Sequence, residues 1–366
     1  MYGARDLRVD DAPEPTLAPG MALVRPRTIS VCGSDLHYYR EGGIGDSRAS
    51  QPLVLGHEFA GEVVAVAPNA GDATDGVAHG AAAPDLRPGM AVAVDPAISC
   101  GACEHCLAGN PNLCLRIRFA GTPPTDGGLQ ELLVWPAHLL RPLPPGMSLE
   151  VGALLEPLGV GIHALDLAKV RLADTVAVLG TGTIGLLAVK LAKLSGAVRV
   201  FATDLVPARL AAARTFGADE VILAAAPHTP HSSDATGNVA AGDPVTRIRA
   251  LTGGRGVDVV IECAGAAETP RQAIEMVRPG GSVVLVGIPE DDRTEFPAGA
   301  ARRKGVTIKL SRRMKHVYPR AMALVDAGLV DLPHLVSHRF PLAQTPDAFA
   351  LLDRPEAGVV KAVIEV

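Results

Sequence analysis

Four cysteines in a fifteen-residue segment constrain the fold of this chain more than any other feature of its sequence. They are Cys100, Cys103, Cys106 and Cys114. Their C-x2-C-x2-C-x7-C spacing lets four thiolates close around one tetrahedral ion, and soft sulfur ligands favour zinc. Because four protein ligands leave no position for a substrate, the spacing predicts a structural zinc site. The alternative is a pair of disulfides or buried free thiols, and the polar character of the segment argues against it.

Length and charge limit the class of protein. A chain of 366 residues is too long for one compact core and indicates two domains, and its 48% hydrophobic and 20% charged residues are typical of a globular protein. A formal net charge of -5 argues against a nucleic-acid partner. Residues 1–15 do not resemble a signal peptide, and no apolar run approaches the roughly 20 residues that span a bilayer. We therefore expect a cytoplasmic protein without a membrane partner, and the clustered cysteines fit a reducing compartment.

The hydrophobic pattern changes along the chain. Short valine-rich runs separated by glycine and proline fill residues 21–95 and predict a β-rich domain. From about residue 152, apolar segments alternate with stretches rich in alanine and leucine, which is typical of βαβ units and a parallel sheet. Segments 68–85 and 224–243 are expected to be loop insertions. The expected strands of the parallel sheet are 175–179, 198–203, 257–262 and 282–286.

A glycine motif, Gly180-Thr-Gly182-Thr-Ile-Gly185, follows the first of these strands and opens a helical segment. In that context it predicts a dinucleotide site, because its glycines permit a tight turn, the approach of a pyrophosphate and close helix packing. Asp204 ends the next strand, where a carboxylate accepts hydrogen bonds from the ribose hydroxyls of NAD. Its charge disfavours NADP, although Arg209 would partly offset it. The residues expected at the cofactor are Gly180, Gly182, Thr183, Ile184, Gly185, Asp204, Arg209, Val286, Gly287 and Ile288.

A third group combines Cys32-Gly-Ser34-Asp-Leu-His37-Tyr38 with Gly56-His57-Glu58. Cysteine, histidine and glutamate are zinc ligand types, but a core thiol and a buried, satisfied imidazole explain such residues as well. Taken with the other motifs, the chain resembles the zinc-dependent medium-chain alcohol dehydrogenases, and among them the polyol branch of sorbitol, xylitol and L-idonate dehydrogenases. The segments that carry the resemblance, in family order, are 32–38, 56–58, the four cysteines, 122–128, 156–163, the glycine motif and 338–341.

The resemblance implies an α/β fold in three parts. These are a GroES-like, β-rich catalytic domain at 1–152, a Rossmann NAD-binding domain with a doubly wound parallel sheet at 153–293, and a segment at 294–366 that returns to the catalytic domain. It also implies a second, catalytic zinc in each subunit, and a homotetramer or homodimer. In the family, the residues that match Cys32 and His57 bind this zinc, Glu58 is a further ligand, and Glu156 contacts the metal directly or through its water.

The other implied roles concern the proton and the substrate. Ser34 and His37 match a relay that passes the proton of the alcohol to solvent, and both residue types suit that task. Tyr38 and Arg313 match residues that face the substrate. The chain departs from the sorbitol enzymes at Met314, where they carry tyrosine, and segment 311–316 is unusually basic. An acid sugar such as L-idonate is therefore one reading of that segment, and a solvated or subunit-facing strand is the other.

Three hypotheses of function remain open from the sequence. The first is a zinc-dependent dehydrogenase that transfers hydride from a secondary hydroxyl of a polyol or sugar acid to NAD, giving a ketose or keto acid. The second is L-threonine 3-dehydrogenase. The third, of another class, is a non-catalytic protein that binds zinc and a nucleotide, and the presence of every matching ligand and relay residue argues against it.

Overall fold

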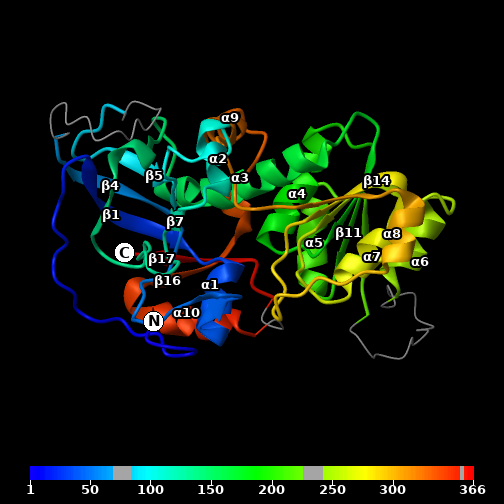
Figure 1. The fold of residues 1–366 in the computed structure, drawn as a ribbon, viewed down its shortest axis with the longest axis horizontal. Coiled ribbons are helices and arrows are strands. Elements are labelled where there is room, and N and C mark those ends of the chain that lie inside the picture. Colours follow the sequence, from blue (N-terminus) through cyan, green and yellow to red (C-terminus); the bar gives the residue numbers. More distant parts are fainter. Residues whose placement is uncertain (69–83, 226–241, 355–357) are drawn as a thin grey trace. The chain divides into compact units, whose positions relative to one another are not determined.

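The computed structural model describes residues 1–68, 84–225, 242–354 and 358–366 (Figure 1). It divides into two compact units. The first unit comprises Met1–Gly159 and Met314–Val366, and the second comprises Val160–Arg313. Most residues of the two expected loop insertions, 68–85 and 224–243, lie outside the described residues.

The unit boundaries differ from those expected at residues 152 and 293. The first falls at Gly159, inside α3 (Leu149–Ala168). The second falls at Arg313, because β15 (Thr307–Leu310) pairs with β14 (Val277–Leu285) and extends the parallel sheet. The return to the first unit therefore begins at Met314 rather than at residue 294.

A seven-stranded sheet forms the frame of the first unit. Its strand order is β16-β17-β1-β4-β5-β9, with β8 also paired to β1. β1 is antiparallel to both β4 and β17, and Ser30 lies in register with Glu58 and with Val363. The strands are β1 (Met21–Ser30), β4 (Glu58–Val66), β5 (Ala91–Val94), β8 (Leu133–Pro136), β9 (Leu140–Pro142), β16 (Val336–Pro341) and β17 (Lys361–Glu365).

Shorter elements complete the first unit. α1 (Gly33–Glu41) begins directly after Cys32 and is capped by Gly42, whose φ of 73° is the left-handed conformation that glycine favours. Phe59 and Trp135 pack edge to face in the core of this unit. The other elements are α2 (Glu104–Leu107), α9 (Tyr318–Asp326), α10 (Thr345–Leu352), β2 (Gly43–Ile44), β3 (Ser47–Arg48), β6 (Ala97–Ile98) and β7 (Arg118–Phe119).

The helix α3 corrects the expectation that no apolar run approaches membrane-spanning length. By length and composition its 20 residues are sufficient to cross a bilayer. However, 83% of an apolar 18-residue stretch of α3 is buried inside the protein. Its apolar character is therefore explained by packing in a protein core.

The second unit is the predicted doubly wound parallel sheet. Its strand order, β12-β11-β10-β13-β14-β15, reverses direction between β10 and β13, and a dinucleotide binds at such a reversal in this type of fold. Helices α4 and α5 pack on one side of the sheet, and α6, α7 and α8 on the other (Figure 1). The further bounds are β10 (Thr175–Leu179), β11 (Arg199–Asp204), β12 (Glu220–Leu223), β13 (Val257–Glu262), α4 (Thr183–Leu194), α5 (Pro207–Thr215), α6 (Pro244–Leu251), α7 (Thr269–Met276) and α8 (Ala298–Lys304).

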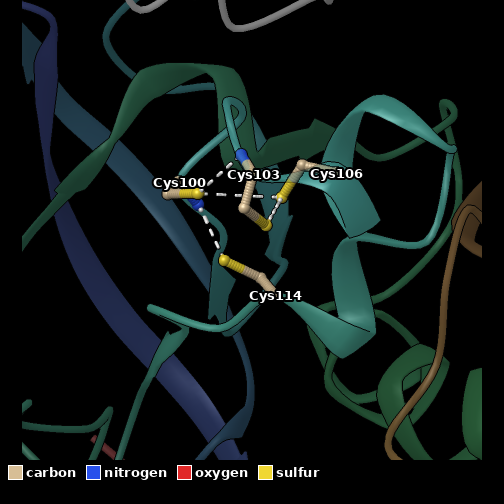
Figure 2. Close-up of side chains that lie close together, drawn as sticks. All are labelled: Cys100, Cys103, Cys106 and Cys114. Carbon is tan, nitrogen blue, oxygen red and sulfur yellow. Dashed lines mark hydrogen bonds between the residues drawn. The ribbon is translucent and has the colours of Figure 1, made fainter.

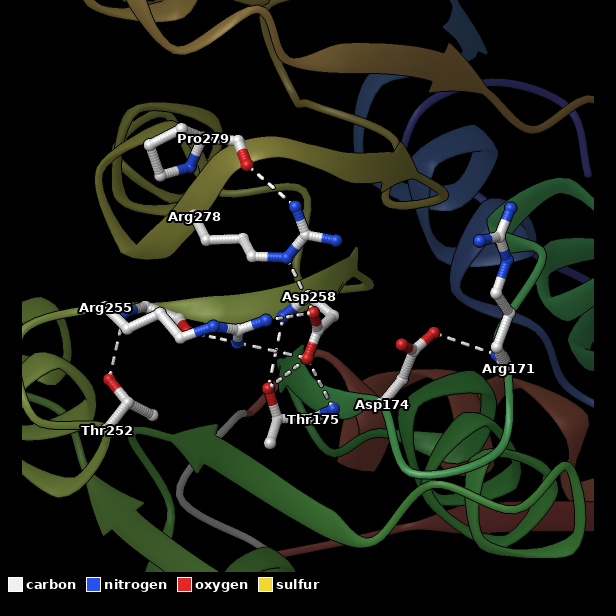
Figure 3. Close-up of polar contacts among 9 residues, drawn as sticks. Arg171, Asp174, Thr175, Thr252, Arg255, Asp258, Arg278 and Pro279 are labelled. Carbon is white, nitrogen blue, oxygen red and sulfur yellow. Dashed lines mark hydrogen bonds and ion pairs between the residues drawn. The ribbon is translucent and has the colours of Figure 1, made fainter.

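Asp258 joins three segments near the amino end of β13 (Figure 3). One carboxylate oxygen accepts hydrogen bonds from Arg255 and from Arg278, each at 2.6 Å. The other oxygen accepts the Thr175 backbone N–H at 2.9 Å and its hydroxyl at 2.8 Å. Burial acts against the charge, but the bonds from the two arginines outweigh it and hold the pKa of Asp258 well below its ordinary value.

We expect Asp258→Asn to lower the free energy of unfolding of the second unit by about 2–4 kcal/mol. The NH2 group of the new amide would face N–H or O–H groups that now donate to the carboxylate, so those donors would lose their acceptor. Urea unfolding followed by far-ultraviolet circular dichroism measures this loss. Since the folded pKa of Asp258 is depressed, its contribution is present above the unfolded pKa of about 4 and is lost as pH falls toward the folded value. The difference between wild type and variant should therefore shrink below about pH 4.

Glu275→Gln is the matched control for this substitution. It removes the charge of an exposed ion pair with Arg271 on α7, and we expect a change below about 1 kcal/mol. A loss for Asp258→Asn no larger than that of the control, or a loss that does not depend on pH, would contradict the prediction.

Candidate functional site

The four cysteines of the predicted structural site lie together (Figure 2). Their sulfur atoms are all within 4.8 Å of one another, and all four are free thiols rather than disulfides. The Sγ atoms of Cys103 and Cys106 are 3.5 Å apart, and those of Cys100 and Cys106 are 4.0 Å apart. Four Zn–S bonds of about 2.3 Å in a tetrahedron require sulfur separations of about 3.8 Å. The cluster therefore fits zinc closely.

Backbone N–H groups support this cluster. Cys103 donates its N–H to the sulfur of Cys100, while Cys100 and Arg116 donate theirs to the sulfur of Cys114, at 3.2–3.4 Å. The Ala102 backbone and other donors lower the pKa of Cys100 to about 5, whereas burial and contact with other thiols raise the pKa of Cys106 to about 12. A divalent cation would lower all four, because thiolates are the binding form.

Cys32, His57 and Glu58 form a second group of metal-ligand type. One ligand atom of each lies within 4.8 Å of the others. Cys32 precedes α1, and Glu58 is the first residue of β4, so the two segments meet where β1 and β4 end their pairing. A thiol, an imidazole and a carboxylate are a donor set that suits zinc.

Asp35 orients this group, although no sequence motif indicated its role. Its carboxylate accepts the N–H of Cys32 at 3.0 Å and of Gly56 at 3.3 Å, and lies 3.3 Å from His57 Nδ1. The other ring nitrogen, Nε2, is then the one that suits a metal. Burial acts against charge on His57, but the Asp35 carboxylate and the Cys32 sulfur outweigh it and raise the pKa of the imidazole.

Lys361 is a second residue that sequence reasoning missed. Its Nζ donates to Glu58 Oε2 at 2.6 Å and to the Val31 carbonyl at 3.0 Å, and the Ser30 hydroxyl donates to the same carboxylate oxygen. The side chains of Lys361 and Glu58 are 3% and 1% exposed. The contact spans 303 residues and arises from strand pairing, so no local spacing indicates it.

Glu156 lies on α3 and is buried. Burial raises its pKa to about 8, with Glu58 raising it further and with His57 and Lys361 acting in the opposite direction. A carboxyl group in such surroundings needs either a proton or an additional positive charge. Glu156 is not one of the three clustered ligand residues, and its contact with a metal stays a prediction.

The two expected relay residues and Tyr38 lie on α1. Ser34 Oγ is 3.4 Å from His57 Nε2, and His37 is half-buried on the same helix. Tyr38 is 3% exposed, and its hydroxyl is hydrogen-bonded to Ser47 at 2.8 Å. The roles of these residues in proton transfer and substrate binding stay predictions.

The basic segment contributes to packing within the first unit. Met314 is buried against Gly159, where a Cβ atom would lie 2.5 Å from its sulfur. Lys315 donates to Asn110 Oδ1 in the lobe that carries the four cysteines. Arg313 is the last residue of the second unit and has a φ of 54°. Its contact with a substrate stays a prediction.

The three motif glycines occupy different surroundings in the second unit. A Cβ on Gly180 would lie 2.8 Å from Ala264, and one on Gly185 would lie 1.9 Å from the Gly180 carbonyl oxygen. A Cβ on Gly182 would meet nothing within 4 Å, so the backbone there borders open space just before α4 begins. This arrangement suits a pyrophosphate at Gly182.

Asp204 is fixed by the loops around it. Its carboxylate accepts the Thr181 N–H at 2.7 Å, the Thr181 hydroxyl at 3.0 Å and the Val206 N–H at 2.9 Å. A carboxylate has about four acceptor positions, so one remains for a ribose hydroxyl. The other residues expected at the cofactor lie at the start of α4, in α5 and after β14, and they are Thr183, Ile184, Arg209, Val286, Gly287 and Ile288.

Comparison with known proteins agrees with this geometry. The alcohol dehydrogenase GroES-like domain matches residues 18–145, and the zinc-binding dehydrogenase domain matches residues 183–327. The sorbitol dehydrogenase of Bacillus subtilis (strain 168) is 34% identical over 348 residues, which are 95% of this chain and 91% of that protein. The probable D-xylulose reductase A of Arthroderma otae is 36% identical over 352 residues, with 95% and 92% covered.

Solved structures show the same relationship. The structure of L-idonate 5-dehydrogenase from Escherichia coli superposes with a TM-score of 0.80 at 27% identity, covering 95% of this chain and 91% of that one. The predicted GroES-like and Rossmann domains, and the resemblance read from the motifs, are thereby confirmed. The chain belongs to the zinc-dependent alcohol dehydrogenase family, in the group that includes the sorbitol dehydrogenases.

Proposed function

We propose that this protein oxidises a secondary hydroxyl group of a polyol or sugar acid and transfers the hydride to NAD, giving a ketose or keto acid. The observation that carries the proposal is the convergence of Cys32, His57 and Glu58 in a chain whose second unit presents a dinucleotide turn. The sorbitol dehydrogenase and xylulose reductase relatives support a polyol, and the L-idonate 5-dehydrogenase structure supports a sugar acid. We further propose that the protein is a cytoplasmic homodimer or homotetramer.

Cys32, His57 and the carboxylates of Glu58 and Glu156 would hold the catalytic zinc, which when bound lowers the pKa of an alcohol as a Lewis acid. Asp35 would keep His57 Nδ1 protonated, so that Nε2 is available. Carboxylates in place of further thiolates make the donor set harder and suit an oxygen-bearing substrate. Cys100, Cys103, Cys106 and Cys114 would hold a second zinc with a structural role.

Ser34 and His37 would move the proton of the alcohol to solvent. They are three residues apart on α1, so their side chains share one face of the helix. A serine hydroxyl donates and accepts at once, and a histidine titrates near neutral pH. Tyr38 and Arg313 would contribute to substrate selection.

The second unit would bind the dinucleotide. Gly182 and the start of α4 would receive the pyrophosphate, and Asp204 would accept a hydrogen bond from the adenosine ribose. The charge of Asp204 favours NAD over NADP, because a 2′-phosphate would be repelled.

Formation of NADH by zinc-replete protein tests the function. We expect absorbance at 340 nm to rise with sorbitol, xylitol, galactitol or L-idonate, and kcat/KM for NAD to exceed that for NADP by about 100-fold or more, as repulsion of a few kcal/mol requires. Simple secondary alcohols and L-threonine are the comparison substrates. Preference for threonine would favour L-threonine 3-dehydrogenase. If no substrate gives NADH although the protein binds zinc and NADH, the non-catalytic hypothesis would be favoured.

Cys32→Ser tests the catalytic metal group. We expect kcat/KM to fall by about 1,000-fold or more, because Lewis-acid stabilisation is worth several kcal/mol. The zinc content measured by mass spectrometry should fall by about one ion per chain, while NADH still binds, since the dinucleotide turn lies in the other unit. Full turnover by this variant would show that the ligand assignment is wrong.

Cys106→Ser tests the four-cysteine cluster and serves as the counterpart of Cys32→Ser. We expect it also to lose about one zinc per chain, but to lower the free energy of unfolding of the first unit by about 3 kcal/mol or more. Fluorescence of Trp135, the one tryptophan, reports unfolding of that unit. Turnover per folded molecule should stay within about threefold of wild type. A Cys106→Ser variant that is as stable as wild type but has no turnover would show that the four-cysteine cluster is the catalytic site and not the structural one.

A further inference from the structure

We propose that Glu262 is a positioning residue of the NAD site, whose buried carboxylate and backbone carbonyl hold together the loops that follow β13 and β14. The proposal rests on the proposed use of NAD. It concerns a residue that the sequence indicated only as the end of a strand.

Glu262 stands where the cofactor site is expected. It is the last residue of β13, and it lies in register with Leu179 of β10 on one side and Leu285 of β14 on the other. These residues end their own strands, so Glu262 is at the carboxyl edge of the parallel sheet. The reversal of strand order between β10 and β13 is at this edge, and loops there contact a bound dinucleotide.

Both ends of Glu262 accept hydrogen bonds from these loops. Its backbone carbonyl accepts the N–H of Val286 at 2.8 Å and of Gly287 at 3.1 Å, in the loop after β14. Its carboxylate oxygen Oε1 accepts three further bonds from the loop after β13 and the start of α7, each 2.8 Å long. The donors are the N–H of Ala264, the N–H of Gly265 and the hydroxyl of Thr269.

Glycines allow the loops to approach this carboxylate closely. A Cβ on Gly287 would lie 2.7 Å from Glu262 Oε2 and 2.2 Å from the Gly265 nitrogen. A Cβ on Gly265, whose φ is 68°, would lie 2.4 Å from the Ile288 carbonyl oxygen. A Cβ on Gly180 of the dinucleotide turn would lie 2.8 Å from Ala264. The loop after β13 therefore lies backbone to backbone against the other two loops, beside Glu262.

The hydrogen bonds to Glu262 favour its ionised form, whereas burial opposes it. Glu262 is 1% exposed, and burial raises its pKa above the ordinary value, although the Gly265 N–H, the Thr269 hydroxyl and the Ala264 N–H favour the charge. Hydrogen bonds to an ionised acceptor are roughly twice as strong as neutral ones. Loops held in this way are ordered before NAD arrives, so that binding loses less conformational entropy.

Glu262→Gln tests the proposal, because it keeps the size of the side chain but removes its charge. It also introduces an NH2 group among the N–H and O–H groups that donate to the carboxylate. We expect the Kd of NADH, measured by nicotinamide fluorescence, to rise by about 10-fold or more, as loss of a charged hydrogen bond requires. Amide hydrogen exchange of the NAD-free protein should become faster in residues 263–269 and 286–288 together. Zinc content and the KM for the polyol at saturating NAD should stay within about twofold.

Thr269→Val is a milder second variant, and it decides the matter if Glu262→Gln does not fold. It removes one donor and leaves the charge, so we expect the Kd of NADH to rise by about threefold. Glu268→Gln is the matched control, since it neutralises a carboxylate in the same loop. Its Kd should stay within about twofold of wild type.

Each outcome has a distinct meaning. Wild-type Kd and exchange in a folded Glu262→Gln protein, or in Thr269→Val, would overturn the proposal while the proposed function stands. Equal losses of NADH affinity, zinc and polyol KM would also overturn it, because they indicate general unfolding. A wild-type protein that binds neither NADH nor NADPH would overturn the proposed function, and this proposal with it.

Discussion

The pairing of β1 with both β4 and β17 is the constraint on which the metal-ligand group depends. Ser30, the last residue of β1, lies in register with Glu58 and with Val363. This register brings Lys361 to Glu58, and Cys32 lies two residues after the end of β1. Because side chains alternate between the faces of a sheet, a slip of one residue would turn Glu58 and Lys361 to opposite faces. The site is thus assembled by sheet register, and α1 only completes it.

Charge balance explains why this group would accept a cation. Acidic groups concentrated in a buried place are costly, because each loses its hydration. Lys361 offsets part of that charge, but burial still raises the pKa of Glu156 to about 8, so this carboxyl keeps its proton near neutral pH. A divalent cation would remove the cost for all of them at once. The acidic members are Cys32, Asp35, Glu58 and Glu156.

The sequence predicted the features that depend on residues close together in the chain, and it missed those that depend on contacts between distant segments. The four-cysteine cluster and the glycine turn are local, so residue spacing and, for the glycines, the adjoining strand and helix indicated them. Strands β10 and β13 have the expected bounds. Lys361 meets Glu58, and the Glu262 carbonyl meets Val286 and Gly287, through pairing of distant strands, so no short motif contains both partners of these contacts. The boundary at Arg313 was missed for the same reason, since β15 joins the parallel sheet by pairing and has no distinctive composition.

The strand β13 carries a buried acid near each end, and the two are neutralised differently. Asp258, near the amino end, is held by two guanidinium groups, whereas Glu262, at the carboxyl end, is held by backbone N–H groups and a hydroxyl. An arginine beside Glu262 would place a long cationic side chain at the edge where the dinucleotide is expected. Amide donors neutralise the acid without occupying that space, and glycines at 265 and 287 let them come close enough. The chemistry at the two ends of one strand therefore separates stability from cofactor binding.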